Sequence, residues 1–188
     1  MKSTSLALIV VCVGLLWLGR AHAARFETHA TNARVPEGTV YDATTKLLWE
    51  MKTPGGTGDV HDVSNRYTWS ATGTAPDGGA FIEFLGALNN AQSNNGKTIT
   101  GCFANLCDWR LPQIDELNGI LDSSATGCGS GRPCINPIFG PTESTSYWSA
   151  TTFDNLQVGA YLALFYQGSL SIDFKKLSAC VRAVRTGL

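Results

Sequence analysis

The sequence has little charge, few histidines and no basic excess. Charged residues make up 15% of its 188 residues, and the formal net charge is −1 at pH 7. A nucleic-acid-binding domain carries clustered positive charge, so this composition argues against that class. The three histidines provide little material for a zinc site or a catalytic base. Apolar residues reach 44%, which suits one globular domain and argues against disorder.

No apolar run has the length of a typical bilayer span. The longest run, residues 6–18, lies near the N-terminus and is followed by Ala21-His22-Ala23, a small-x-small cleavage pattern. This arrangement predicts a signal peptide over residues 1–23, cut after Ala23, and a secreted or periplasmic protein. An uncleaved membrane anchor is the alternative. A lipoprotein is disfavoured because Cys12 follows a valine rather than a small residue.

Cleavage would change both the charge and the cysteine count. It removes two of the 14 basic residues, leaving 12 against 15 acidic ones, a net charge of −3. Five cysteines remain, and in an oxidising compartment they are expected to form disulfides. We expect the local pairs Cys102–Cys107 and Cys128–Cys134, although sequence alone does not fix connectivity. Cys180 is left over; we expect it to be buried in the last strand, with an intermolecular disulfide as the alternative.

The N-terminal half predicts one hairpin, one long loop and one helix. Residues 24–37 lack periodicity and form a lead-in, and residues 40–50 contain two β-rich runs around a polar turn. Residues 53–79 are rich in Gly, Pro, Thr and Asp and form a long loop. Apolar residues at i, i+3, i+4 and i+7 within residues 81–88 predict an amphipathic helix, ended by residues 94–96 (Asn-Asn-Gly).

The C-terminal half predicts a second helix and several strands. Pro112 suits the first turn of a helix that continues to Leu121. Beyond it lie two Gly- and Pro-rich loops. Strands are expected over four segments, residues 147–152, 158–167, 169–174 and 179–185.

Five of the tryptophan and tyrosine residues are candidates either for the core or for ligand binding. Trp49, Trp109 and Trp148 lie within or next to predicted elements and are expected in the core. Tyr67 and Trp69 lie in the long polar loop and are the candidate ligand-binding residues, as an exposed stacking platform. The alternative is that they attach this loop to the core.

Three arginines have no clear ligand role. Arg110 precedes the second helix, where a hydrogen-bonding role to loop carbonyls is expected. Arg182 and Arg185 are predicted to point to different faces and give no anion-binding patch. The acidic net charge also disfavours strong polyanion binding.

Several motifs resemble those of the DUF1566 family, the Lcl C-terminal domain found in the Legionella collagen-like adhesin. The resemblance covers about residues 38–187, with residues 38–188 as the predicted domain. It rests on a combination of short motifs: Trp109-Arg110-Leu111-Pro112, Glu116-Leu117, Tyr147-Trp148-Ser149-Ala150, Gly168 and Val181-Arg182-Ala183-Val184-Arg185. The resemblance implies an α+β, C-type-lectin-like fold, related to formylglycine-generating enzymes, with two helices, a small twisted antiparallel sheet and long loops. It further implies a bacterial surface or secreted protein, often adhesive, and brings no established catalytic residues.

The sequence predicts neither catalysis nor a cofactor. An oxidase of the formylglycine-generating type needs reactive thiols, but the cysteines are better explained as disulfides, and no suitable histidine base is present for a hydrolase. Calcium needs six to eight clustered oxygens, and Asp59 and Asp62 form only a sparse pair. We therefore expect no metal site.

The sequence favours a secreted or periplasmic binding or adhesion domain. Its partner would be a polysaccharide or a cell-surface protein, contacted through the loops over residues 53–79 and 128–141. The alternative is a structural component of an envelope or secreted assembly without a small ligand, and an enzyme comes third. No nucleic-acid partner and no membrane span after cleavage are expected, and the oligomeric state is left open.

Overall fold

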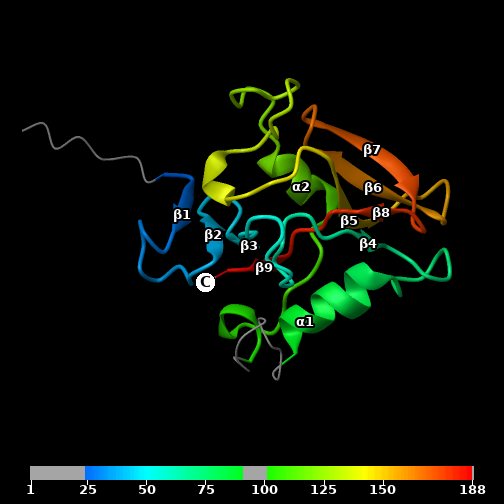
Figure 1. The fold of residues 1–188 in the computed structure, drawn as a ribbon, viewed down its shortest axis with the longest axis horizontal. Coiled ribbons are helices and arrows are strands. Elements are labelled where there is room, and N and C mark those ends of the chain that lie inside the picture. Colours follow the sequence, from blue (N-terminus) through cyan, green and yellow to red (C-terminus); the bar gives the residue numbers. More distant parts are fainter. Residues whose placement is uncertain (1–23, 91–100, 188) are drawn as a thin grey trace, which may run out of the picture.

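The chain forms an α+β fold of small antiparallel sheets and short helices (Figure 1). The computed structural model describes residues 24–90 and 101–187. The predicted signal peptide over residues 1–23 lies outside the described residues. Within the described ranges, no helix is long and apolar enough to cross a bilayer.

The first sheet has the strand order β1-β2-β3-β9. Its strands are β1 (Phe26–Thr28), β2 (Thr39–Asp42), β3 (Leu47–Glu50) and β9 (Val184–Thr186). The predicted hairpin is confirmed, with Val40 of β2 opposite Trp49 of β3. Asp42 closes the turn, since its Oδ1 accepts a hydrogen bond from Thr44 N at 2.9 Å. β1 lies in the predicted lead-in and becomes a strand through its pairing with β2.

The second sheet consists of β5 (Ser146–Thr152), β6 (Gly159–Leu164) and β7 (Ser169–Phe174), in that order. These strands confirm three of the predicted segments. Gly168, with a φ of +70°, lies in the turn between β6 and β7, where a residue with a side chain would be strained. A ribbon of β4 (Tyr67–Thr68) and β8 (Ser178–Ala179) joins the long loop to the C-terminal half. Figure 1 shows β7 at the outer edge of the molecule.

The predicted strand over residues 179–185 is wrong, because the chain there is divided between β8 and β9. The buried side chain of Arg182 fixes this crossing between sheets. Its Nη1 donates hydrogen bonds to the carbonyls of Glu50 at 2.7 Å and Phe139 at 3.0 Å. These carbonyls come from distant segments, so no local pattern indicates the interruption.

The first helix combines a π-helical segment, η1 (Ala80–Leu85), with α1 (Gly86–Asn89). It confirms the helix predicted from the apolar spacing, with Phe84 and Leu88 facing the core. The predicted end at residues 94–96 is wrong, because Asn90 already has an extended backbone. Those three residues themselves lie outside the described part of the chain.

The second helix is α2 (Ile114–Ile120). It confirms the predicted helix but begins after Pro112, with Gln113 as the N-cap. Gln113 N donates to Glu116 Oε2 at 2.7 Å, which satisfies an amide that the helix leaves free. Two short 3₁₀ segments, η2 (Phe103–Asn105) and η3 (Pro137–Phe139), interrupt the loops on either side.

The interior consists of two neighbouring apolar clusters. Trp109 and Trp148 lie in one with Phe84, and Trp49 lies in the other with Phe139. Each of these three tryptophans is at most 2% exposed, which confirms their predicted place in the core. The long loops are therefore attached to a packed body.

Both predicted disulfides are present, Cys102–Cys107 and Cys128–Cys134. They are consistent with an extracytoplasmic protein. Cys180 is a free cysteine that is 1% exposed, as predicted. Its burial leaves no surface for the intermolecular disulfide that the sequence left open.

Candidate functional site

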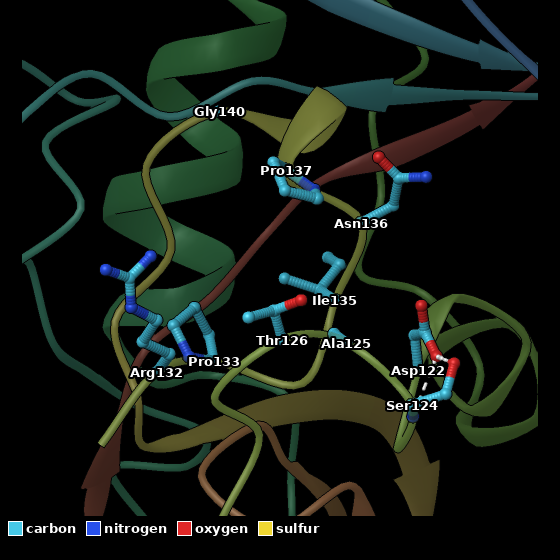
Figure 2. Close-up of a pocket in the computed structure, with 10 residues that line it drawn as sticks. All are labelled: Asp122, Ser124, Ala125, Thr126, Arg132, Pro133, Ile135, Asn136, Pro137 and Gly140. Carbon is cyan, nitrogen blue, oxygen red and sulfur yellow. Dashed lines mark hydrogen bonds between the residues drawn. The ribbon is translucent and has the colours of Figure 1, made fainter. Parts of the chain in front are cut away.

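A pocket opens in the loops that connect α2 to β5 (Figure 2). Its volume is about 530 Å³. We call it the Arg132 pocket, and its lining residues are Asp122, Ser124, Ala125, Thr126, Arg132, Pro133, Ile135, Asn136, Pro137 and Gly140. Six of its lining residues fall within residues 128–141, one of the two loop regions that the sequence predicts as the binding surface, and the other four lie just before that region.

Backbone hydrogen bonds and a disulfide fix the walls of the Arg132 pocket. Asp122 N donates to Cys134 O at 2.8 Å, and Cys134 N donates to Phe165 O at 2.7 Å, just after β6. The bond between Cys128 and Cys134 closes the loop between these walls. A ligand would therefore meet preformed walls, which reduces the entropy lost on binding.

Two side chains use one polar atom to shape their own loop and leave another without a protein partner. Asp122 Oδ1 accepts hydrogen bonds from Ser124 N at 2.9 Å and Ser124 Oγ at 2.6 Å. Asn136 Oδ1 accepts from Ile138 N at 3.0 Å. Within the described residues, Asp122 Oδ2 and the Asn136 amide nitrogen have no such partner. The pocket thus offers an acceptor and a donor.

Arg132 provides the positive charge of the pocket. Its guanidinium forms no ion pair in the described part of the chain, and Figure 2 shows it on the opposite side of the view from Asp122 and Ser124. The stem of Arg132 lies against Gly127, where an added Cβ would come within 2.7 Å of Arg132 Cδ. Gly127 therefore permits this position, and its φ of +88° also favours glycine.

The two candidate aromatic residues of the long loop have different positions. Trp69 is 4% exposed, packs edge-on against Phe81 and donates from Nε1 to Ser149 O at 2.9 Å. It lies in the core, as in the alternative that the sequence left open. Tyr67 is half-buried against Phe84, with ring centroids 5.6 Å apart, and lines a second pocket. Ligand binding by Tyr67 stays a prediction.

A buried charged group lies at the base of the long loop. Glu50 Oε1 accepts from Lys52 Nζ at 2.9 Å and His61 Nδ1 at 2.8 Å, while Glu50 Oε2 accepts from Ala183 N at 2.9 Å. Burial raises the pKa of Glu50, but Lys52 and His61 outweigh it and hold this pKa below its usual value. This cluster of Glu50, Lys52 and His61 connects the long loop to β3 and, through Ala183, to the segment between β8 and β9.

Asp62 organises the same loop through its own carboxylate. Its oxygens accept from Gly56 N at 2.8 Å, Gly58 N at 3.0 Å and Ser64 N at 2.9 Å. These bonds, with that from Ser64 Oγ, hold its pKa well below the usual value. Both oxygens are thereby engaged by protein donors. Among the described residues, no group of three or more potential metal ligands gathers.

The three arginines make ion pairs and hydrogen bonds within the protein. Arg110 pairs chiefly with Glu116, through Nη1–Oε2 and Nη2–Oε1 contacts of 2.7 Å each. Arg110 Nη1 also donates to the carbonyl of Leu111 at 3.2 Å, as the sequence predicts, and Arg182 binds three further backbone carbonyls. Arg185 lies in β9 and pairs with Asp108, so these groups are structural.

Sequence reasoning identified the loop of the Arg132 pocket but missed its polar residues. Asp122-Ser-Ser is a pattern for a carboxylate that bonds its own loop, and Asn136-Pro is a pattern for a capping residue. Both patterns indicate turns rather than ligands. Arg132 gives no signal by itself, because its partners depend on the fold.

The family comparison covers most of the chain. The model of the Lcl C-terminal domain matches residues 38–185. A search of curated proteins gives no match. The matched region includes both pockets and both disulfides. The chain therefore belongs to the Lcl C-terminal domain family, a bacterial domain family.

Proposed function

We propose that this protein is a secreted or periplasmic binding domain that recognises a carbohydrate in the Arg132 pocket. The observation that carries the proposal is a preformed pocket of about 530 Å³ with unpartnered polar groups on its walls. Its size falls within the range of ligand pockets, roughly 300–1,000 Å³. The two disulfides support the extracytoplasmic location.

The chemistry of the pocket matches a ligand rich in hydroxyl groups. A hydroxyl both donates and accepts, so it can donate to Asp122 Oδ2 and accept from the Asn136 amide or the Arg132 guanidinium. Hydrogen bonds to charged groups contribute about 1.5–3 kcal/mol each, more than neutral ones. Pro133 and Pro137 add apolar surface for the carbon skeleton of the ligand.

The proposal includes a C-type-lectin-like scaffold that acts without catalysis, cofactor or metal. Long loops on small antiparallel sheets with two short helices support this scaffold. The lining of the Arg132 pocket includes neither a histidine nor a free thiol, which supports binding rather than catalysis. Adhesion to a polysaccharide follows as the role of such a domain.

A structural role in an envelope assembly is the second candidate, and one observation favours it. Leu170, Ile172 and Phe174 alternate along β7 and are 39%, 39% and 56% exposed. Exposed apolar patches mark contacts with other proteins. A component of this kind would show no glycan binding.

A glycan array probed with the full chain, with and without a chelator, tests the carbohydrate proposal. We expect binding that persists with the chelator and is lost in Arg132→Ala. Asn136→Asp should also weaken binding, because it keeps the oxygen that caps Ile138 N but removes the amide donor. Arg34→Ala, an exposed arginine elsewhere on the chain, is the matched control. No glycan signal in either condition, or equal signals for Arg132→Ala and the original chain, would contradict the proposal.

A further inference from the structure

A second polar pocket lies between the long loop and the first helix. Its volume is about 480 Å³. We call it the Tyr67 pocket, and its polar lining residues are Asp59, Asn65, Arg66, Tyr67 and Glu83. The full lining comes from two separate segments, residues 58–67 of the loop and residues 83–87 of the first helix, so the pocket exists only in the folded chain.

Hydrogen bonds within the long loop fix the wall of the Tyr67 pocket that this loop forms. Asp59 Oδ1 accepts from Thr53 Oγ1 at 3.1 Å and from His61 N at 2.8 Å. Asn65 Nδ2 donates to Asp59 O at 2.8 Å. Asp62 gathers the adjoining amides, as described above. This loop therefore presents a preorganised surface, which favours ligand binding.

Tyr67 and Glu83 meet at the opposite wall over Gly79. A Cβ added at Gly79 would lie 3.2 Å from Tyr67 Cδ1 and 3.4 Å from Glu83 Oε2. Burial, and then the charges of Glu50 and Glu83, raise the pKa of Tyr67 to about 12, so its phenol is a neutral donor at pH 7. An aromatic ring and a carboxylate thus lie side by side.

The lining of this pocket carries a small excess of negative charge. Asp59 and Glu83 contribute two negative charges and Arg66 one positive charge, which leaves one net negative charge. Arg66 also donates from Nη2 to Thr145 Oγ1 at 3.4 Å, outside the pocket lining. Glu83 is exposed and forms no ion pair in the described ranges. An ammonium group would supply the missing charge and three donors.

We propose that the Tyr67 pocket binds an amino sugar through its protonated amine, with the carboxylates of Asp59 and Glu83 as its acceptors. The sugar ring packs against the half-buried Tyr67 ring, and the phenol donates to a sugar hydroxyl. This site shares no residue with the Arg132 pocket, so the inference does not depend on the proposed function.

Calorimetric titration of the full chain at pH 6 tests this inference with two probes. One is the glucosamine tetrasaccharide, which carries free amines, and the other is its fully N-acetylated counterpart. We expect the free-amine probe to bind at least about tenfold more tightly, the value of one charge-assisted hydrogen bond. Glu83→Gln should weaken binding of this probe about tenfold, and Tyr67→Phe by a smaller factor.

The control is Asp154→Asn, which removes one exposed negative charge from the turn after β5, away from the pocket lining. It should leave the affinity unchanged. Equal affinity for the two probes, or equal weakening by Glu83→Gln and Asp154→Asn, would overturn the proposal. Loss of amine binding in Arg132→Ala rather than in Glu83→Gln would also overturn it, by placing the amine in the other pocket.

Discussion

Replacing Glu50 with Gln should destabilise the protein strongly while keeping the shape of the side chain. The Lys52 side chain is 2% exposed, and its Nζ lies 2.9 Å from Glu50 Oε1. Glu50→Gln leaves this buried ammonium without its counter-charge. Removing one partner of a buried ion pair costs about 3–5 kcal/mol in the free energy of unfolding. With a slope of roughly 2 kcal/mol per molar urea, the unfolding midpoint should fall by about 2 M.

The double variant Glu50→Gln/Lys52→Met is the matched control, since it removes both charges. It should recover a large part of the lost stability, because the buried methionine needs no counter-charge. Urea unfolding of the three proteins, followed by circular dichroism, measures both steps. A single variant that loses less than about 1 kcal/mol, or a double variant no more stable than the single one, would refute the reasoning.

The same carboxylate gives stability a dependence on pH. Burial raises the pKa of Glu50, yet Lys52 and His61 bring it below the value of 4.5 for an unperturbed side chain. A lowered pKa means that the folded state binds the proton less tightly than the unfolded state. The contribution of Glu50 is therefore complete above pH 4.5 and is lost as pH falls through the folded pKa. Glu50→Gln should remove this part of the acid sensitivity.

Three further predictions concern the disulfides, the free cysteine and the long loop. Cys134→Ser should lower the free energy of unfolding by about 2 kcal/mol, the contribution of a disulfide that closes a short loop. It should also weaken glycan binding in the Arg132 pocket. An unchanged urea midpoint would contradict this prediction. Cys180 should be unreactive toward Ellman's reagent in the folded protein, because it is buried and burial raises its pKa. After denaturation, the protein without residues 1–23 should show one reactive thiol per chain. Two or more reactive thiols would disprove the disulfide scheme. Hydrogen bonds from Thr72 and Ser70 lower the pKa of Asp77 from 3.8 to about 2. The stabilising effect of the Asp77 carboxylate should therefore be lost as the pH falls from 3.8 to about 2. Hydrogen exchange of residues 70–78 should show this loss of protection in the original chain, and Asp77→Asn should not show it.

Local sequence patterns determined the larger helices and hairpins of this protein and favoured its two disulfides. Apolar spacing over residues 81–88 specified a helix, because a helix must bury one stripe, and Gly168 between two β-rich runs specified a hairpin turn. The short separations of Cys102–Cys107 and Cys128–Cys134 favoured local disulfides. The motifs around Trp109 also indicated the family.

Tertiary structure decided the role of each charged and aromatic side chain. Arg182 interrupts the last predicted strand because its partners are the carbonyls of residues 50 and 139, which only folding brings together. Trp69 and Tyr67 are two positions apart in one loop, but Trp69 is buried in the core whereas Tyr67 is half-buried and lines a pocket. Burial depends on contacts between distant segments, so local pattern could not distinguish them.

For the proposed binding surfaces too, sequence and tertiary structure determined different features. The sequence pointed to the loops over residues 53–79 and 128–141, because binding residues usually lie on loops of a rigid scaffold. It did not associate Asp122 with Arg132, or Tyr67 with Glu83, since each pair lines the same pocket only in the folded chain. The sequence alone determined the first hairpin, the two helices and strands β5 to β7. The tertiary structure decided the short strands β1, β4 and β8 and which polar groups are left without a protein partner, because both depend on contacts between separate segments.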